Sequence, residues 1–146
     1  MCSSDLVLLG QVLDYYHERL MQSEPALTYL EKRGLRDDAM LRRFKIGMAD
    51  RTLGMRLPEN SRRTGEELRT RLVQLGVLRK TGHEHFNGCI VTPIYNEAGV
   101  VSELYGRRFC EESKSLRHLY LPGPHGGIFN HEAAFAGPEL ILCESV

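Results

Sequence analysis

The first third of the chain carries apolar residues at helical spacing. A stripe with steps of three and four predicts an amphipathic helix that starts at Ser4 or Asp5 and includes Leu6, Leu9, Leu13, Tyr16 and Leu20. A second helix is predicted after the Ser-Glu-Pro of residues 23–25, because proline fits a first helical turn without losing a hydrogen bond. Gly34 ends this helix, and a third, shorter one is predicted for residues 37–43.

A fourth helix is predicted after a short extended piece, residues 44–48, and an irregular stretch, residues 49–63. Thr64 followed by Glu67 has the pattern of a capping box, in which the two residues satisfy each other's backbone N–H groups. Gly76 closes this helix, and its apolar stripe is Leu68, Leu72 and Leu75.

The pattern changes to that of β-structure after residue 80. Two β-rich runs, residues 89–95 and 100–109, flank the turn sequence Asn-Glu-Ala-Gly and predict a hairpin. Pro93 cannot donate a ladder hydrogen bond, so it requires an edge position or a bulge. Alternation in the second run places four side chains on one face: Val101, Glu103, Tyr105 and Arg107.

The rest of the chain adds two predicted strands. Residues 117–121 form the first, and residues 122–127 are a loop because they include two prolines and three glycines. Residues 139–144 form the last, and its continuous apolar run is typical of a strand buried on both faces. We therefore predict an α+β fold class, with a helical N-terminal half over about residues 1–80 and a mainly antiparallel β-sheet over about residues 81–139.

Composition indicates a globular protein with one domain, or one domain with a helical annex. The 146 residues are 42% hydrophobic and 26% charged. No apolar run approaches the roughly 20 residues that span a membrane, and the first residues lack a basic signal-peptide region. The four cysteines are scattered, which favours reduced thiols and a cytoplasmic location.

The net charge of zero hides an uneven distribution. Residues 32–80 hold 14 of the 19 Lys and Arg residues against six acidic ones, a local charge of +8. The segments before and after this block each carry a net charge of −4. Such a basic block suggests a polyanionic partner, and the alternative is a solvated helical surface.

Motifs along nearly the whole chain resemble those of the DnaG-type bacterial DNA primases. The strongest is the hairpin, where residues 86–94, Gly99 and the Gly106-Arg107 pair resemble the central hairpin of that family. The other motifs follow in the family's order at residues 29–35, 43–47, 75–78, 118–122, 128–130 and 140–144. The resemblance covers roughly residues 10–144.

The resemblance implies that residues 1–139 are the N-terminal subdomain of a primase catalytic core. Residues 140–146 would be the first strand of a truncated Toprim domain, with Glu144 as its first catalytic carboxylate. In that family this Glu holds Mg²⁺ together with later Asp residues, so Glu144 is a metal ligand only in the full-length protein. One carboxylate cannot hold the cations that nucleotidyl transfer needs, so we expect the fragment itself to be inactive. The alternative for Glu144 is a surface charge at a native C-terminus.

No cofactor is expected in the fragment. His83 and His85 lie two residues apart without a nearby cysteine pair, which argues against zinc. The family's zinc ribbon would lie upstream, and its Mg²⁺ belongs to the full-length enzyme. The Gly-rich residues 123–127 lack the Lys-Ser/Thr of a P-loop.

The resemblance also assigns nucleic-acid-binding residues. A basic groove of the family receives the single-stranded template, and the Gly106-Arg107 pair matches the Gly-Arg that ends the family's hairpin. His118 stands where the family has a lysine, and Asn87 stands where it has a template-facing arginine. Arg108 and Arg117 can compensate for these weaker positions. The alternative for Arg107 is an ordinary charge at a strand end.

Two functions from different classes follow. The first is the template-binding part of a DNA-directed RNA polymerase that makes primers. The expected partners of the full-length enzyme are single-stranded DNA, ribonucleotides and a replicative helicase. No association with a membrane is expected. The second is a non-catalytic module derived from a primase, of the kind a mobile element carries, which binds single-stranded DNA or a partner protein. An Asp-x-Asp pair in α/β sequence after Val146 would favour the first.

Overall fold

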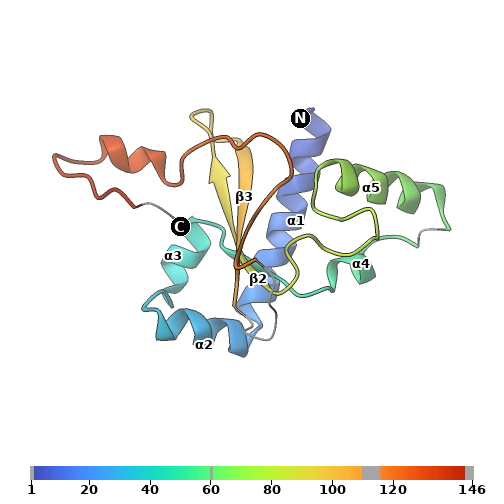
Figure 1. Cartoon of the computed structure of the whole chain (residues 1–146), viewed down its shortest axis with the longest axis horizontal. Helices are drawn as coiled ribbons and strands as arrows, with labels where there is room; N and C mark the ends of the chain where they lie inside the picture. Colours follow the sequence, from blue (N-terminus) through green and yellow to red (C-terminus); the bar gives the residue numbers. More distant parts are fainter. Residues whose placement is uncertain (1, 60, 110–115, 144–146) are drawn as a thin grey trace.

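The computed structural model of the chain describes residues 2–59, 61–109 and 116–143. These residues form an α+β fold, as predicted, with a helical first half followed by a hairpin-centred sheet (Figure 1). The helices are α1 (Ser3–Met21), α2 (Glu24–Lys32), α3 (Asp38–Arg43), α4 (Leu53–Arg56) and α5 (Arg63–Gln74), with a 3-10 helix η1 (His131–Phe135). The strands are β1 (Gly47–Ala49), β2 (Cys89–Tyr95), β3 (Val101–Arg108) and β4 (His118–Tyr120).

Local sequence explains the first three helices. The Ala26 N–H donates to the Ser23 side chain at 3.4 Å, and the Met40 N–H donates to the Asp37 carboxylate at 2.7 Å. These bonds satisfy N–H groups that a helix start leaves without an intrahelical partner. Gly34 follows α2 in the left-handed region, with φ of 70°.

The predicted capping box is wrong. α5 begins at Arg63, its N-cap is Arg62 without a capping side-chain bond among the described residues, and Thr64 lies inside the first turn. The chain turns just before the helix, and its backbone passes directly over Gly65. A Cβ atom added at Gly65 would lie 2.2 Å from the Glu59 carbonyl oxygen.

The described strands form one antiparallel sheet in the order β1-β2-β3-β4. β1 pairs with Cys89–Val91 of β2, so Pro93 lies beyond that pairing and has no hydrogen-bonded strand on that side among the described residues. The register of the hairpin shifts between Ile94 and Tyr95, one residue further along. Both features agree with the edge or bulge that the proline requires.

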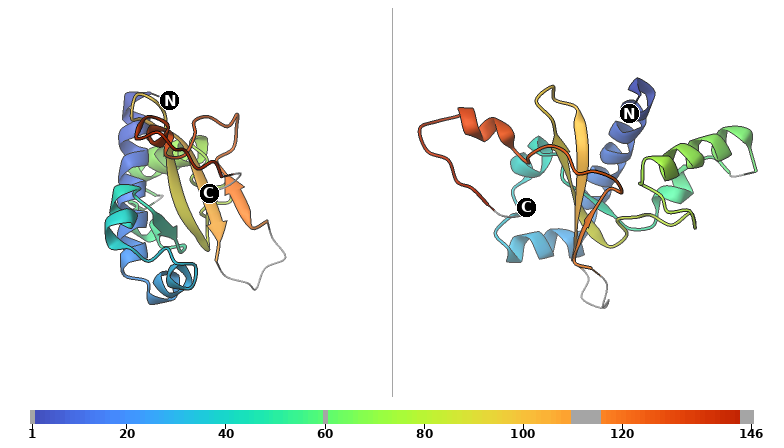
Figure 2. Two further views of the ribbon diagram at one scale, coloured as in Figure 1. Left: turned by 90° about the vertical axis from the view of Figure 1, so that its left-hand side faces the viewer. Right: turned by 45° about the horizontal axis from the view of Figure 1, so that its top comes forward.

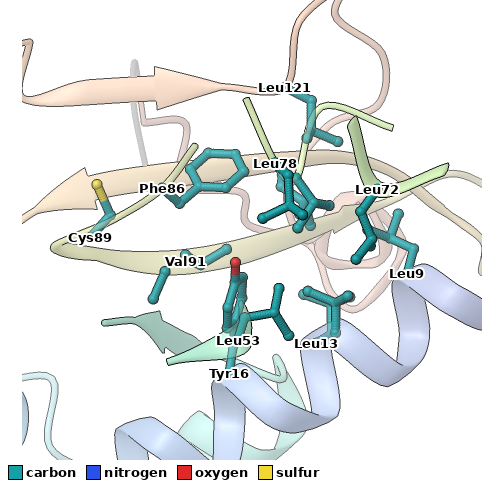
Figure 3. Close-up of a cluster of buried hydrophobic side chains, with 14 of the residues drawn as sticks. Leu9, Leu13, Tyr16, Leu53, Leu72, Leu78, Phe86, Cys89, Val91 and Leu121 are labelled. Carbon is teal, nitrogen blue, oxygen red and sulfur yellow. The ribbon is translucent and has the colours of Figure 1, made fainter. Parts of the chain in front are cut away.

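One face of the sheet packs closely against α1 (Figure 3). Leu9, Leu13 and Tyr16 point from α1 toward Val91 and the residues around it, and all are almost fully buried. Gly47 of β1 touches the helix, since a Cβ atom there would lie 2.6 Å from the Tyr16 Cβ. This α1 face therefore forms the main hydrophobic core.

The opposite face is covered by helices at one end and by the loop of residues 122–127 at the other, where Gly127 lies against Ile94. Met48 of β1 and Ile90 of β2 pack there against apolar residues of α1, α2 and α3: Leu20, Ala26, Leu27, Leu30 and Leu41. The left view of Figure 2 shows β4 at the edge of the sheet that is far from α2 and α3. The β3 and β4 part of this face therefore extends beyond the helices.

The predicted last strand is not formed in the described residues. Residues 139–143 have no regular structure, and Ile141 and Leu142 are more than four-fifths exposed. A strand needs a neighbour that accepts and donates its backbone hydrogen bonds, and this segment extends away from the sheet (Figure 1). The assignment of residues 140–146 to a second domain remains a prediction, and Glu144 lies outside the described residues. None of the helices that the structure describes has both the length and the apolarity needed to cross a membrane.

Candidate nucleic-acid interface

The antiparallel register of β3 and β4 brings two predicted site residues together. Arg107 is directly opposite His118, and Tyr105 is directly opposite Tyr120. Residues directly opposite each other share a face, so all four lie on the face away from α1. We call the surface formed by Tyr105, Arg107, His118, Tyr120 and His125 the β3–β4 face.

Tyr105 is the buried centre of this surface, with 2% of its area exposed. Its hydroxyl is joined to His118 Nδ1 by a hydrogen bond of 2.6 Å. Burial raises the pKa of Tyr105, and the positive charge of Arg107 opposes this rise. The phenol therefore stays neutral and holds the His118 ring in place, while His118 itself is exposed.

Aromatic side chains extend the surface in both directions. The ring centroids of Tyr105 and Tyr120 lie 5.3 Å apart, and those of Tyr120 and His125 lie 4.6 Å apart. On the other side Phe109 packs against Tyr29 of α2, which has the Arg33 guanidinium 5.5 Å above its ring. Aromatic rings interleaved with cationic side chains are the typical composition of a single-strand binding surface.

A buried acid lies beneath this surface, and sequence reasoning did not single it out. Glu103 is 3% exposed, and its Oε1 accepts backbone N–H groups from Leu104 at 3.0 Å and Leu121 at 2.9 Å. Its Oε2 accepts a hydrogen bond of 2.9 Å from His125 Nδ1. Alternation predicted the face correctly, but glutamate is usually exposed and its loop partners are not visible in the sequence.

The remaining predicted residues lie on the other face at the same end of the sheet. Arg108 is directly opposite Cys89, and its guanidinium lies beside Gly88, which follows Asn87 in a turn. The Arg108 backbone N–H donates to the Arg117 carbonyl at 2.9 Å. Arg108 Nε is buried and has no hydrogen-bond partner among the described residues. The structure therefore divides the five nucleic-acid candidates into two groups. Arg107 and His118 form the first, and Arg108, Arg117 and Asn87 form the second.

The basic block does not form one surface. Some of its residues lie in the loops, and the helices that carry the others are α2 and α3 on one side of α1 and α4 and α5 on the other (Figure 1). Arg71 of α5 is paired with Asp5 at 2.8 Å, and the Asp5 pKa is lowered to about 2 by the Cys2 side chain first and by Arg71 next. Arg69 donates to the carbonyl oxygens of Gly54 and Pro58. These two arginines tie elements of the fold together.

A shallow pocket of about 270 Å³ lies where α3 ends. The ring centroids of Phe44 and Phe129 are 5.1 Å apart within it, and Asn130 and His131 line it as well.

No three His, Cys, Asp or Glu side chains of the described part of the chain gather in a way that could hold a metal ion. The described residues therefore do not fit a magnesium or zinc site.

Comparisons with known proteins agree on one family. The family model for the DNA primase catalytic core, N-terminal domain, matches residues 15–137. A DNA primase of Helicobacter pylori (strain J99) is 27% identical over 141 residues, which is 93% of this chain but only 23% of that protein. The chain thus spans less than a quarter of the length of this curated relative.

Solved structures show the same fold. The zinc-binding and RNA polymerase domains of the Aquifex aeolicus primase match with a TM-score of 0.66 and 26% identity, over 82% of this chain and 29% of that one. The DnaG primase catalytic domain bound to ssDNA matches with a TM-score of 0.65 and 24% identity, over 82% of this chain and 39% of that one.

Proposed function

Because this chain belongs to the family of DNA primase catalytic-core N-terminal domains, we propose that it binds the single-stranded template of a DnaG-type primase. In the full-length enzyme it would guide the template toward a Toprim domain that makes RNA primers for DNA replication, in the cytoplasm. The observation that carries the proposal is the β3–β4 face, where Arg107 and His118 lie opposite each other beside exposed rings.

Two physical contributions support binding at this face. Arg107 offers a permanent positive charge to a phosphate, and release of condensed counterions makes such a contact strongly dependent on salt. Tyr120 is 38% exposed and offers a ring to a base, and a base–aromatic stack contributes about 1–3 kcal/mol. Neither contribution by itself reads the base sequence. A protein of the same fold, the DnaG primase catalytic domain, has a structure bound to ssDNA.

Catalysis is assigned to the full-length enzyme. Glu144 would hold Mg²⁺ there together with later carboxylates, ribonucleotides would be its substrates, and a replicative helicase would recruit it. Leu140, Ile141 and Leu142 are exposed apolar residues, and burial of such residues would drive their packing against that domain. The zinc that the family binds would be held by the zinc ribbon, which in that family precedes the region that this chain resembles. Purified alone, this chain should incorporate no ribonucleotides on a template, and incorporation would contradict the assignment.

Fluorescence anisotropy with a labelled oligonucleotide, from low to physiological salt, tests the proposal. Arg107→Ala should weaken binding and flatten the logarithmic salt dependence by roughly 0.7, the slope of one single-strand phosphate contact. Arg63→Ala is the matched control, since it removes the same charge from an exposed site on α5 where the side chain pairs with Glu67. If the two variants weakened binding equally, the attraction would depend on overall charge alone. The assignment of DNA binding to the β3–β4 face would then be refuted.

A further inference from the structure

The β3–β4 face carries an unbroken row of rings that ends in a loop residue. The ring of His118 contacts that of Tyr105, Tyr105 contacts Tyr120, and Tyr120 contacts His125, with centroid distances of 5.8, 5.3 and 4.6 Å. The first three belong to the sheet. His125 comes from the loop of residues 122–127, so the outermost ring of the row is on a different kind of element.

The loop is fixed at its base, and at its tip His125 makes the bond to Glu103. The Ser102 hydroxyl donates to the Gly126 carbonyl at 3.1 Å, and Gly127 is so close to Ser102 that a Cβ atom would lie 2.5 Å from its hydroxyl oxygen. At the other end, Pro122 packs against Gly76. Between these anchors, the His125 side chain is 64% exposed. A side chain this open to water can leave its place without unfolding the loop base.

His125 makes two contacts that an unpaired nucleobase could also make. Its ring lies 4.6 Å from that of Tyr120, with the two ring planes tilted by 55°, and its Nδ1–H donates to the Oε2 atom of Glu103. A base can take the same place over the ring of Tyr120 in a flatter stack, and a carboxylate is a standard acceptor for the amino group of cytosine. Glu103 is fixed by the two backbone N–H groups on its other oxygen, so the acceptor stays in position when His125 leaves.

We propose that the ring of Tyr120 is a binding site for one base of a single strand, and that His125 occupies this site in the free protein. The incoming base displaces His125, stacks on Tyr120 and donates an amino hydrogen to Glu103. Cytosine fits this requirement. Thymine fits poorly, because its one N–H lies between two carbonyl oxygens that a carboxylate repels. The inference rests on the proposed single-strand binding and adds a preference that binding through phosphates alone would not have.

The test compares oligonucleotides of deoxycytidine and deoxythymidine of equal length, by anisotropy at neutral pH. His125→Ala should bind the deoxycytidine strand more tightly than the unmodified protein does, by about three- to tenfold, since no internal ring has to leave. His83→Ala, which removes an exposed imidazole elsewhere, should leave both affinities unchanged. Tyr120→Ala should abolish the preference for deoxycytidine, whereas Tyr120→Phe should keep it.

Glu103→Gln separates stacking from the hydrogen bond. Its amide oxygen can still accept the two backbone N–H groups, but its NH₂ group can donate to a thymine carbonyl, so the preference for deoxycytidine should disappear while binding persists. Far-UV circular dichroism and thermal unfolding establish that each variant is folded. An unchanged or weaker affinity of His125→Ala for deoxycytidine, or equal affinities for the two strands, would overturn the inference and leave salt-dependent template binding intact. No binding of either strand by any variant at low salt would overturn both.

Discussion

The two faces of the sheet use the same strands for opposite purposes. On the α1 face, Gly47, Val91 and Gly106 are in register across β1, β2 and β3, and the helix and Phe86 leave no room for larger residues. On the β3–β4 face, the neighbouring positions Arg107 and His118 stay accessible to solvent. Alternation along one strand thus places the main core on one face and the proposed ligand contacts on the other.

Each face also holds one buried glutamate, and the two differ in their surroundings. Glu84 lies in the core, where its Oε1 accepts the Leu53 N–H at 3.0 Å and helps to start α4. Its Oε2 and the Tyr16 hydroxyl influence each other's pKa, but neither has a hydrogen bond of standard geometry among the described residues. Glu103, by contrast, is bonded through both oxygens and reaches solvent through His125. The first acid therefore serves the fold, and the second holds a surface side chain.

The largest effect is expected at the contact between β1 and α1. Gly47→Ala should lower the free energy of unfolding by about 3 kcal/mol, because the new methyl group meets the backbone of Tyr16 and His17, which cannot move aside. Gly10→Ala is the control, since no heavy atom of another element lies within 4 Å of a Cβ there, and alanine in a helix should add about 0.5–1 kcal/mol. Urea unfolding followed by circular dichroism measures both. Similar stabilities of the two variants would disprove the close packing.

A smaller loss of stability is expected at the core glutamate. Glu84→Ala should lower the free energy of unfolding by about 2 kcal/mol, because the buried Leu53 N–H loses its acceptor. Glu97→Ala in the exposed hairpin turn is the matched control and should change little. Salt-dependent DNA binding by the folded Glu84→Ala protein should match that of the unmodified protein, and altered binding would contradict the separation of the two faces.

The same residue predicts a dependence of stability on pH. Burial raises the pKa of Glu84 above its ordinary value of 4.5. A carboxyl with a raised pKa in the folded state stabilises the protein below 4.5 and loses that contribution as pH rises through the raised value. Glu84→Gln removes this titration, so the stability of the variant relative to the unmodified protein should increase from acidic toward neutral pH. Urea midpoints measured across that range would show a constant difference if Glu84 did not titrate abnormally.

The smallest effects concern the two groups of cationic candidates. His118→Lys and Asn87→Arg should each tighten binding of a single strand about two- to threefold and steepen the salt dependence, because each adds a permanent charge. The comparison between the variants shows which face of the sheet the DNA strand follows, since His118 and Asn87 lie on opposite sides of the sheet end. Unchanged affinity in both variants would show that the DNA does not bind at this end of the sheet.

Local signals in the sequence were sufficient for most of the elements. The caps at Ser23 and Asp37 and the left-handed glycines at Gly34 and Gly76 act over one or two turns, so they determine where helices start and stop. The hairpin is also local, and its strand β2 has the predicted bounds of Cys89–Tyr95. The pairing of Arg107 with His118 was not predicted from spacing, but the motif order pointed to both residues.

Contacts between distant residues decided the rest. α4 starts where the Leu53 N–H meets Glu84, 31 positions away. The basic block looks continuous in sequence, yet α1 divides it in space. Glu103 looks like an exposed strand residue, yet Leu121 and His125 enclose it. Periodicity reports which face a residue takes, whereas the partners on that face are set by chain segments that the fold brings together from far apart.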